Sequence, residues 1–129
     1  MSAFKDHFFQ TQDGLRLYAR DYPGPDDNAP VVLCLHGLTR NSRDFQELTP
    51  ALADHFRVLV PEQRGRGRSD YDDDLSRYAL LQYVEDMRGL LSDLGIKQVA
   101  IVGTSMGGLM TFALNAVSYT HLTLPTRRF

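Results

Sequence analysis

The sequence predicts an α/β protein with a parallel sheet and a β-hairpin at the front edge of that sheet. Three short segments, at 31–35, 57–60 and 98–102, are nearly continuous runs of apolar residues. Strands of this kind are apolar on both faces, as in a parallel sheet covered by helices on both sides. Between them, apolar residues recur at spacings of three and four, which is the period of an amphipathic helix. Strands that alternate with helices in this way predict an α/β parallel sheet.

The hairpin is predicted from the first residues of the chain. Two β-prone stretches, 8–11 and 15–20, flank the pair Asp13-Gly14. This pair is typical of a tight hairpin turn, because both central positions of such a turn favour positive φ. Residues 22–30 are rich in proline, aspartate and glycine, and we expect them to form a loop before the first buried strand.

Helices are expected after each of the buried strands. The first helical region, 45–56, is interrupted or restarted at Thr49-Pro50. The second, 78–94, is the clearest helix of the chain, and Gly95 stands where a left-handed cap would end it. A third helix is expected to start near Met106. The apolar stripe of the second helix consists of Leu80, Val84, Met87, Leu91 and Leu94.

Composition favours one globular domain and excludes several classes of partner. The 129 residues are 43% hydrophobic and 23% charged, with a formal net charge of −2. Because acidic and basic residues are interspersed, we expect no nucleic-acid partner and no membrane partner. No secretory signal and no apolar run near the ~18 residues of a membrane span are present, so we expect a cytoplasmic protein. The single cysteine, Cys34, excludes an internal disulfide and is expected to be buried.

A motif between the last buried strand and the helix after it carries the chemistry. Residues 103–107, Gly-Thr-Ser-Met-Gly, match the pattern Gly-x-Ser-x-Gly. A sharp turn from strand to helix strains the backbone of such a serine, and glycines two positions away leave room for the turn. The start of the helix directs N–H groups at an oxyanion near the serine Oγ. We therefore expect Ser105 to be a nucleophile supported by Gly103 and Gly107; the alternative is an ordinary glycine-rich turn.

A second motif, His36-Gly37-Leu38, follows the first buried strand. Acyl transfer needs two N–H donors for the developing oxyanion. One comes from the residue after the nucleophile, here Met106, and the other from a loop after an adjacent strand. Leu38 is well placed to supply the second N–H, in a loop supported by Gly37. We assign His36 an orienting role without proton transfer, because an isolated histidine is more often a structural hydrogen-bonding residue.

Two charged segments are expected to be structural. Residues 64–70, Arg-Gly-Arg-Gly-Arg-Ser-Asp, could suggest a nucleic-acid loop, but the chain has no other basic cluster and its net charge is negative. These arginines can pair with Glu62, Asp70 or the acidic run 72–74. We expect that acidic run to be a solvated loop, and we expect no metal and no cofactor.

Four blocks in order resemble the α/β-hydrolase superfamily, in its pimeloyl-ester esterase and meta-cleavage hydrolase-like branch. The resemblance covers about the first 115 residues and implies that Ser105 is the nucleophile, with Leu38 and Met106 donating the oxyanion-hole N–H groups. The serine argues against the dehalogenase and epoxide-hydrolase relatives, which use aspartate there. Glu62 stands where aspartate is more usual. The blocks are the front hairpin, His-Gly-Leu-Thr-Arg-Asn-Ser-Arg-Asp-Phe, Pro-Glu-Gln-Arg-Gly-Arg-Gly-Arg-Ser-Asp and Gly-Thr-Ser-Met-Gly-Gly.

The other members of a catalytic triad are not expected in this chain. A serine nucleophile needs a histidine base oriented by a carboxylate, and in this fold both follow it far downstream. No Asp or Glu follows Ser105, and we reject His121 as the base because the helix after the turn leads away from it. We expect an inactive fragment with an incomplete sheet, in which the strand 98–102 is an exposed edge.

The last residues resemble the translation of a sequencing adaptor. Residues 117–126, Val-Ser-Tyr-Thr-His-Leu-Thr-Leu-Pro-Thr, match a transposon-end adaptor codon by codon, and Ala116 is compatible with the bases before it. We therefore expect 1–116 to be the N-terminal portion of an α/β-hydrolase catalytic domain and 117–129 to be a non-native tail. The alternative is a natural helix end followed by a strand-like tail.

The expected function is hydrolysis of carboxylic esters or related acyl substrates, with a small-molecule ester or acyl compound as the partner. In this family the substrate pocket is shaped largely by a cap inserted further along the chain. Two alternatives stay open: a carbon–carbon bond hydrolase of ring-cleavage products, and a non-catalytic hydrolase-like binding protein.

Overall fold

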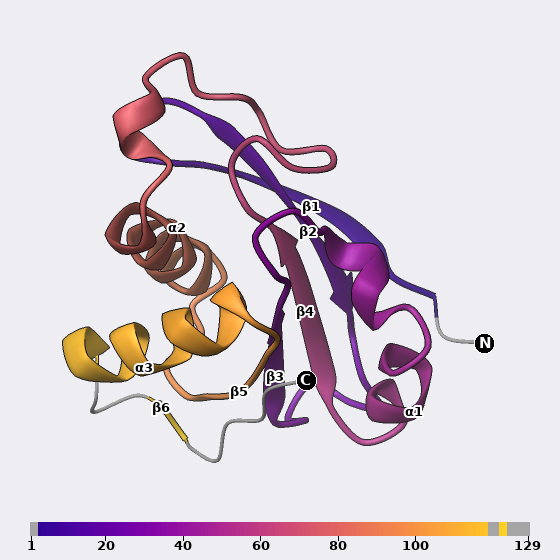
Figure 1. Cartoon of the computed structure of the whole chain (residues 1–129). Coiled ribbons are helices and arrows are strands. Elements are labelled where there is room, and N and C mark those ends of the chain that lie inside the picture. Colours follow the sequence, from indigo (N-terminus) through magenta and orange to yellow (C-terminus); the bar gives the residue numbers. More distant parts are fainter. Residues whose placement is uncertain (1–2, 119–121, 124–129) are drawn as a thin grey trace.

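Figure 1 shows the chain as a computed structural model, in which residues 3–118 and 122–123 are described, with side chains as far as Leu114. Helices and strands alternate after an N-terminal hairpin. In order they are β1 (Lys5–Gln10), β2 (Arg16–Tyr22), β3 (Val31–Leu35), the 3-10 turn η1 (Ser42–Phe45), α1 (Thr49–Ala53), β4 (Arg57–Glu62), the 3-10 turn η2 (Leu75–Arg77), α2 (Leu80–Asp93), β5 (Val99–Gly103), α3 (Met106–Ser118) and β6 (Leu122–Thr123).

The strands form one mixed sheet, with the order β1-β2-β4-β3-β5-β6 over the described residues. β1 pairs with β2 and β2 with β4 in antiparallel fashion, while β4, β3 and β5 run parallel. The prediction of three parallel strands with 31–35 in the middle is therefore confirmed. The architecture is the N-terminal part of an α/β-hydrolase fold, as predicted.

Tertiary pairing makes the hairpin longer than its local sequence predicted. β1 starts three residues earlier and β2 ends two residues later than the predicted stretches. The added residues are held by their neighbours across the sheet: Lys5 pairs with Asp21, and Tyr22 pairs with Val58 of β4. A polar, unpatterned stretch can join a sheet when a partner strand satisfies its backbone.

The helices divide the core into two layers. In Figure 1, α2 and α3 lie on one face of the sheet and α1 on the other. Leu33 and Leu35 of β3 pack toward the α2 and α3 side, whereas Val32 and Cys34 pack toward the α1 side. The two-sided apolar strand is therefore confirmed. Burial raises the pKa of the Cys34 thiol to about 12, so this cysteine is a neutral packing residue.

The ends of the helices follow the sequence signals. Gly95 ends α2 with a φ of +69°, and the N–H of Ile96 donates to the carbonyl of Leu91 at 2.8 Å. This is the bond pattern of a left-handed helix cap. The region 45–56 is broken, as expected, into η1 and α1, with Pro50 in the first turn of α1.

The expectation of an exposed edge at β5 is wrong for part of the strand. β6 pairs with Val99 and Ala100 on the outer side of β5. In addition, Val99 and Ile101 are only 2% and 1% exposed, since they belong to the core beneath α2 and α3. The face of this strand beneath α2 and α3 is thus covered within the chain, whereas Ala100 and Val102 on the other face are half-buried.

A buried charge cluster ties the hairpin tip, the loop after β4 and α2 together. Arg64 is fully buried and donates to Asp86 through Nε and Nη2 at 2.8 and 2.7 Å. Its Nη1 donates to Asp72 at 2.7 Å and to Asp13 at 2.9 Å. Arg77 also donates to Asp72, from Nε at 2.7 Å. Asp72 is therefore a buried partner of two arginines.

This cluster corrects the expectation of a solvated acidic run. Asp73 and Asp74 are exposed, as expected, but Asp72 is buried because Arg64 and Arg77 neutralise it. Pairing of the loop arginines with the run 72–74 is confirmed at Asp72. Pairing with Asp70 is not observed among the described residues; its carboxylate accepts the N–H of Arg16 instead, at 2.9 Å.

The Asp72 carboxyl gives the fold a testable acid sensitivity. Hydrogen bonds from Arg77, together with those from Arg64, hold the pKa of Asp72 well below its usual range. Its contribution to stability is therefore complete above the unfolded-state pKa of about 3.9 and is lost as the pH falls through the lower folded-state pKa. Urea denaturation followed by circular dichroism between about pH 2 and pH 6 should show a smaller loss of stability at low pH in Asp72→Asn. The exposed neighbour provides the control Asp73→Asn, which should keep the pH dependence of the parent chain; an equal change in both variants would contradict this account.

Candidate active site

Ser105 lies on the tight turn between β5 and α3. Its φ is +52°, the one positive φ at a non-glycine residue in the described part of the chain. A left-handed backbone costs a residue with a side chain about 1–2 kcal/mol, so the surrounding structure must hold it in place. The N–H of Thr104 donates to the carbonyl of Leu35 at 3.0 Å, and the N–H of Gly108 donates to the carbonyl of Ser105 at 2.9 Å. The Ser105 side chain is exposed.

The two glycines of the motif are required by close backbone approach. A Cβ atom on Gly103 would overlap the backbone of Gly107, and a Cβ atom on Gly107 would overlap the carbonyl of Leu35. Backbone atoms cannot move aside as a flexible side chain can. The strand, the turn and the helix can therefore pack this closely only with glycine at both positions.

The loop 36–38 lies against this turn. A Cβ atom on Gly37 would be 3.5 Å from Cβ of Ser105 and 3.8 Å from the carbonyl oxygen of Thr104. Leu38 is 55% exposed, whereas the Met106 side chain is buried and its N–H belongs to the first residue of α3. Among the described residues, neither the Leu38 N–H nor the Met106 N–H donates a hydrogen bond. Both N–H groups are therefore free to donate to a ligand, and that of Met106 lies at a helix N-terminus, where such free N–H groups are usual.

His36 is a buried structural residue. Its Nε2 accepts the N–H of Gln63 at 3.0 Å, so Nδ1 carries the ring proton and donates to the carbonyl of Gly37 at 2.7 Å. Burial lowers the pKa of His36 and keeps the ring neutral. With both nitrogens bonded and no exposed surface, the ring orients the loop and has no free site for proton transfer.

The loop after β4 holds residues whose contacts the sequence did not predict. The Nε of Arg66 donates to the carbonyl of Leu38 at 2.9 Å. Glu62 is buried, and its carboxylate accepts from Ser42 Oγ at 3.0 Å and from the N–H of Arg68 at 2.8 Å. A Cβ atom on Gly67, whose φ is +53°, would overlap this carboxylate. The longer acid at position 62 therefore fits because residue 67 has no side chain.

Among the described residues, no hydrogen bond joins Ser105 Oγ to a histidine. His36 is bonded as above, His7 of the hairpin pairs with Asp93 of α2 at 2.9 Å, and the ring of His55, after α1, lies 6.4 Å from that of Phe56. His121 lies outside the described residues, and of the predicted non-native tail 117–129 only 117–118 and 122–123 are described.

Within the described ranges, no group of three or more His, Cys, Asp or Glu could hold a metal ion. None of the described helices is both long enough and apolar enough to cross a bilayer.

The fold and this strand–serine–helix turn define the class of the protein. A family model described as the alpha/beta hydrolase fold matches residues 30–121. The chain therefore belongs to the α/β-hydrolase fold family. The match ends inside the segment 117–129, so the predicted boundary at 116 stays a prediction.

Known proteins similar to this chain include several hydrolases. The 3-hydroxybutyrate-oligomer hydrolase of Cupriavidus necator is 43% identical over 101 residues, which cover 78% of this chain and 34% of that protein. Epoxide hydrolase A of Mycobacterium tuberculosis is 33% identical over 101 residues, covering 78% and 31%. The crystal structure of an alpha/beta hydrolase from Novosphingobium aromaticivorans is 44% identical, with a TM-score of 0.91 over 99% of this chain and 44% of that chain. The chain thus spans about a third of the length of these curated relatives.

Strain at Ser105 can be measured directly. Because glycine adopts positive φ without steric cost, Ser105→Gly should be more stable than Ser105→Ala by about 1 kcal/mol. Urea denaturation of the two variants measures this difference, since neither keeps the hydroxyl. The matched pair Ser92→Gly and Ser92→Ala in α2 should show the opposite order. Equal stability of the two Ser105 variants would mean that the turn is not strained.

Proposed function

We propose that this chain supplies the nucleophile and the oxyanion-binding amides of a serine hydrolase that acts on carboxylic esters or related acyl substrates. The observation that carries the proposal is the strained, exposed Ser105 beside Gly37, since the N–H groups of Leu38 and Met106, the residues that follow Gly37 and Ser105, have no partner among the described residues. A strained nucleophile at a strand-to-helix turn is a recurrent arrangement for acyl transfer. An ordinary glycine-rich turn would not require positive φ at its serine.

The chemistry follows from these positions. Ser105 Oγ attacks the substrate carbonyl, and the carbonyl oxygen takes up negative charge. The N–H groups of Leu38 and Met106 donate to that oxygen, and the partial positive charge at the start of α3 adds to the stabilisation. A histidine outside the described residues takes up the Ser105 proton, and an acid there orients that histidine. The histidine then gives the proton to the leaving alcohol as the tetrahedral intermediate collapses, and water hydrolyses the acyl-serine that remains. The neutral, fully bonded His36 keeps the oxyanion loop in place.

The relatives support hydrolysis as the reaction, and the serine at position 105 favours one kind of bond. The 3-hydroxybutyrate-oligomer hydrolase and epoxide hydrolase A each match this chain over 101 residues. Serine at position 105 favours acyl transfer over epoxide opening, because the epoxide-hydrolase branch uses aspartate at this turn. A further relative, 2-(acetamidomethylene)succinate hydrolase of Mesorhizobium japonicum, is 35% identical over 80 residues. A carbon–carbon bond hydrolase would use the same turn, so a substrate panel should include both bond types.

The proposed partner is a small molecule and the proposed location is the cytoplasm. The interspersed charges and the net charge of −2 support a partner other than nucleic acid or a membrane surface. The buried pairing of Arg64 and the loop contact of Arg66 support this further, because two of the loop arginines hold the fold together and are not presented to a polyanion.

Ester turnover tests the proposal. In the whole protein that carries this segment, Ser105→Ala should lower kcat/KM for p-nitrophenyl acetate by at least about 10³-fold, because the nucleophile is lost. The 129-residue chain alone should hydrolyse the ester at the background rate of the buffer, and His121→Ala in that chain should change nothing. Retention of turnover by Ser105→Ala in a correctly folded whole protein would refute the proposal. Turnover by the short chain that disappears in both variants would identify His121 as the base.

A further inference from the structure

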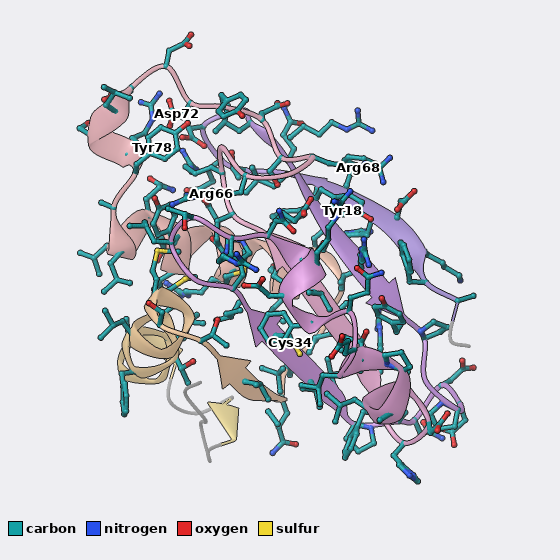
Figure 2. All side chains as sticks on the ribbon, turned by 45° about the vertical axis from the view of Figure 1, so that its right-hand side comes forward. Tyr18, Cys34, Arg66, Arg68, Asp72 and Tyr78 are labelled. Atoms are coloured by element: carbon teal, nitrogen blue, oxygen red, sulfur yellow. The ribbon has the colours of Figure 1, made fainter. Side chains whose placement is uncertain are left out.

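Arg66 links the loop after β4 to the loop that carries the proposed oxyanion donor. Its Nε donates to the carbonyl of Leu38 at 2.9 Å, and its Nη1 donates to the carbonyl of Arg64 at 2.8 Å and to the hydroxyl of Tyr83 at 3.0 Å. The guanidinium also lies over two rings, 5.0 Å from the centroid of Tyr83 and 5.9 Å from that of Tyr78. Figure 2 labels Arg66 and Tyr78 on the same side of the molecule. One side chain thus joins three segments of the chain.

The contact with Leu38 completes the restraint on its backbone. The peptide that carries the Leu38 N–H begins with the carbonyl of Gly37, which accepts from Nδ1 of His36 at 2.7 Å and from the N–H of Arg40 at 3.1 Å. Because a peptide group is planar, these two bonds hold the Leu38 N–H as well as the Gly37 carbonyl. Arg66 holds the next peptide, which joins Leu38 to Thr39, through the carbonyl of Leu38. The backbone is therefore held on both sides of the Leu38 Cα, and Arg66 acts on the Leu38 N–H through the φ and ψ of that residue.

Arg66 is itself held in place by a residue of the core, so it can restrain the backbone of Leu38. Tyr83 belongs to α2 and is buried in the core, so the hydroxyl that accepts from Arg66 is fixed to a helix. Arg68, two residues along the same loop, has a different environment. Its side chain is 58% exposed, and it contacts Asp6 and Tyr18 on the hairpin. The loop therefore directs one arginine toward Leu38 and another away from it.

We infer that Arg66 is a positioning residue, which holds the peptide after Leu38 and thereby keeps the Leu38 N–H directed at the oxyanion that forms at the substrate carbonyl. This inference rests on the proposed roles of Ser105 and Leu38. An oxyanion donor is effective because it is oriented before the reaction, and small displacements at such a site cost large factors in rate. Loss of Arg66 should therefore lower the rate of the chemical step more than it weakens substrate binding.

Steady-state kinetics of the whole protein with p-nitrophenyl acetate test this inference. Arg66→Met should lower kcat by about 10- to 100-fold with KM changed by less than about threefold, because one oxyanion donor contributes about 10²–10³ in kcat. Tyr83→Phe removes one anchor of the guanidinium and should lower kcat in the same direction by a smaller factor. Arg68→Met is the matched control from the same loop and should keep the kcat of the parent. An unchanged kcat in Arg66→Met, or an equal loss in Arg68→Met, would overturn the inference while the role of Ser105 stands.

A second measurement separates this inference from the proposed function. ¹⁵N relaxation of the Leu38 amide in the whole protein should show greater picosecond–nanosecond mobility in Arg66→Met than in the parent or in Arg68→Met. The mobility of the Leu38 amide does not depend on turnover. It therefore tests whether Arg66 restrains Leu38 even when Ser105→Ala shows that the proposed function is wrong. Where Arg66→Met does not fold, Tyr83→Phe takes its place in both experiments. An unchanged Leu38 order parameter in the variant that folds would overturn the inference.

Discussion

The first turn of α3 lies against the end of β3, and the placement of the candidate site depends on this close approach. The carbonyl of Leu35 accepts the N–H of Thr104 at 3.0 Å and leaves no room for a side chain on Gly107. Leu35 also pairs with Gly103 in the parallel ladder between β3 and β5. Because the loop 36–38 begins at the next residue, the same contact that positions the serine turn also brings Gly37 beside it. Two loops that are far apart in the sequence are therefore both positioned by the backbone of Leu35.

The buried charge cluster after β4 is a second constraint on the loops of this sheet. Burial opposes the charge on Arg64, but hydrogen bonds from its guanidinium to Asp86 and Asp13 outweigh this and raise its pKa. Burial raises the pKa of Asp86, and its bonds to Arg64 act in the opposite direction. Removing one member of such a cluster leaves an uncompensated buried charge, so each member depends on the others. We interpret it as a device that fixes the path of the loop, and with it the position of Arg66.

The features predicted from the sequence are those with a local signature. The apolar pattern of 31–35 predicted a central strand, and the motif around Ser105 predicted a strand-to-helix turn that only glycines permit. The contacts that were missed connect residues far apart in the sequence. Asp72 is buried because Arg64 folds back onto it, and Arg66 reaches Leu38 across 28 positions. From composition alone, the segments around Asp72 and Arg66 are both charged loops. The residue that neutralises or orients such a charge can stand at any distance from it in the sequence, so no sequence pattern predicts the pair.

The strand order explains why these loops cooperate. In parallel sheets, functional residues gather at the carboxyl ends of the strands, and β4, β3 and β5 are neighbours in that order. With β3 in the middle, its loop lies between the loop of β4, which holds Arg66, and the turn of β5, which holds Ser105. The middle loop is held by Arg66 on one side and lies against Ser105 on the other. The strained backbone of Ser105 is held by the close packing of Leu35, Gly103 and Gly107, and the residue itself stays exposed.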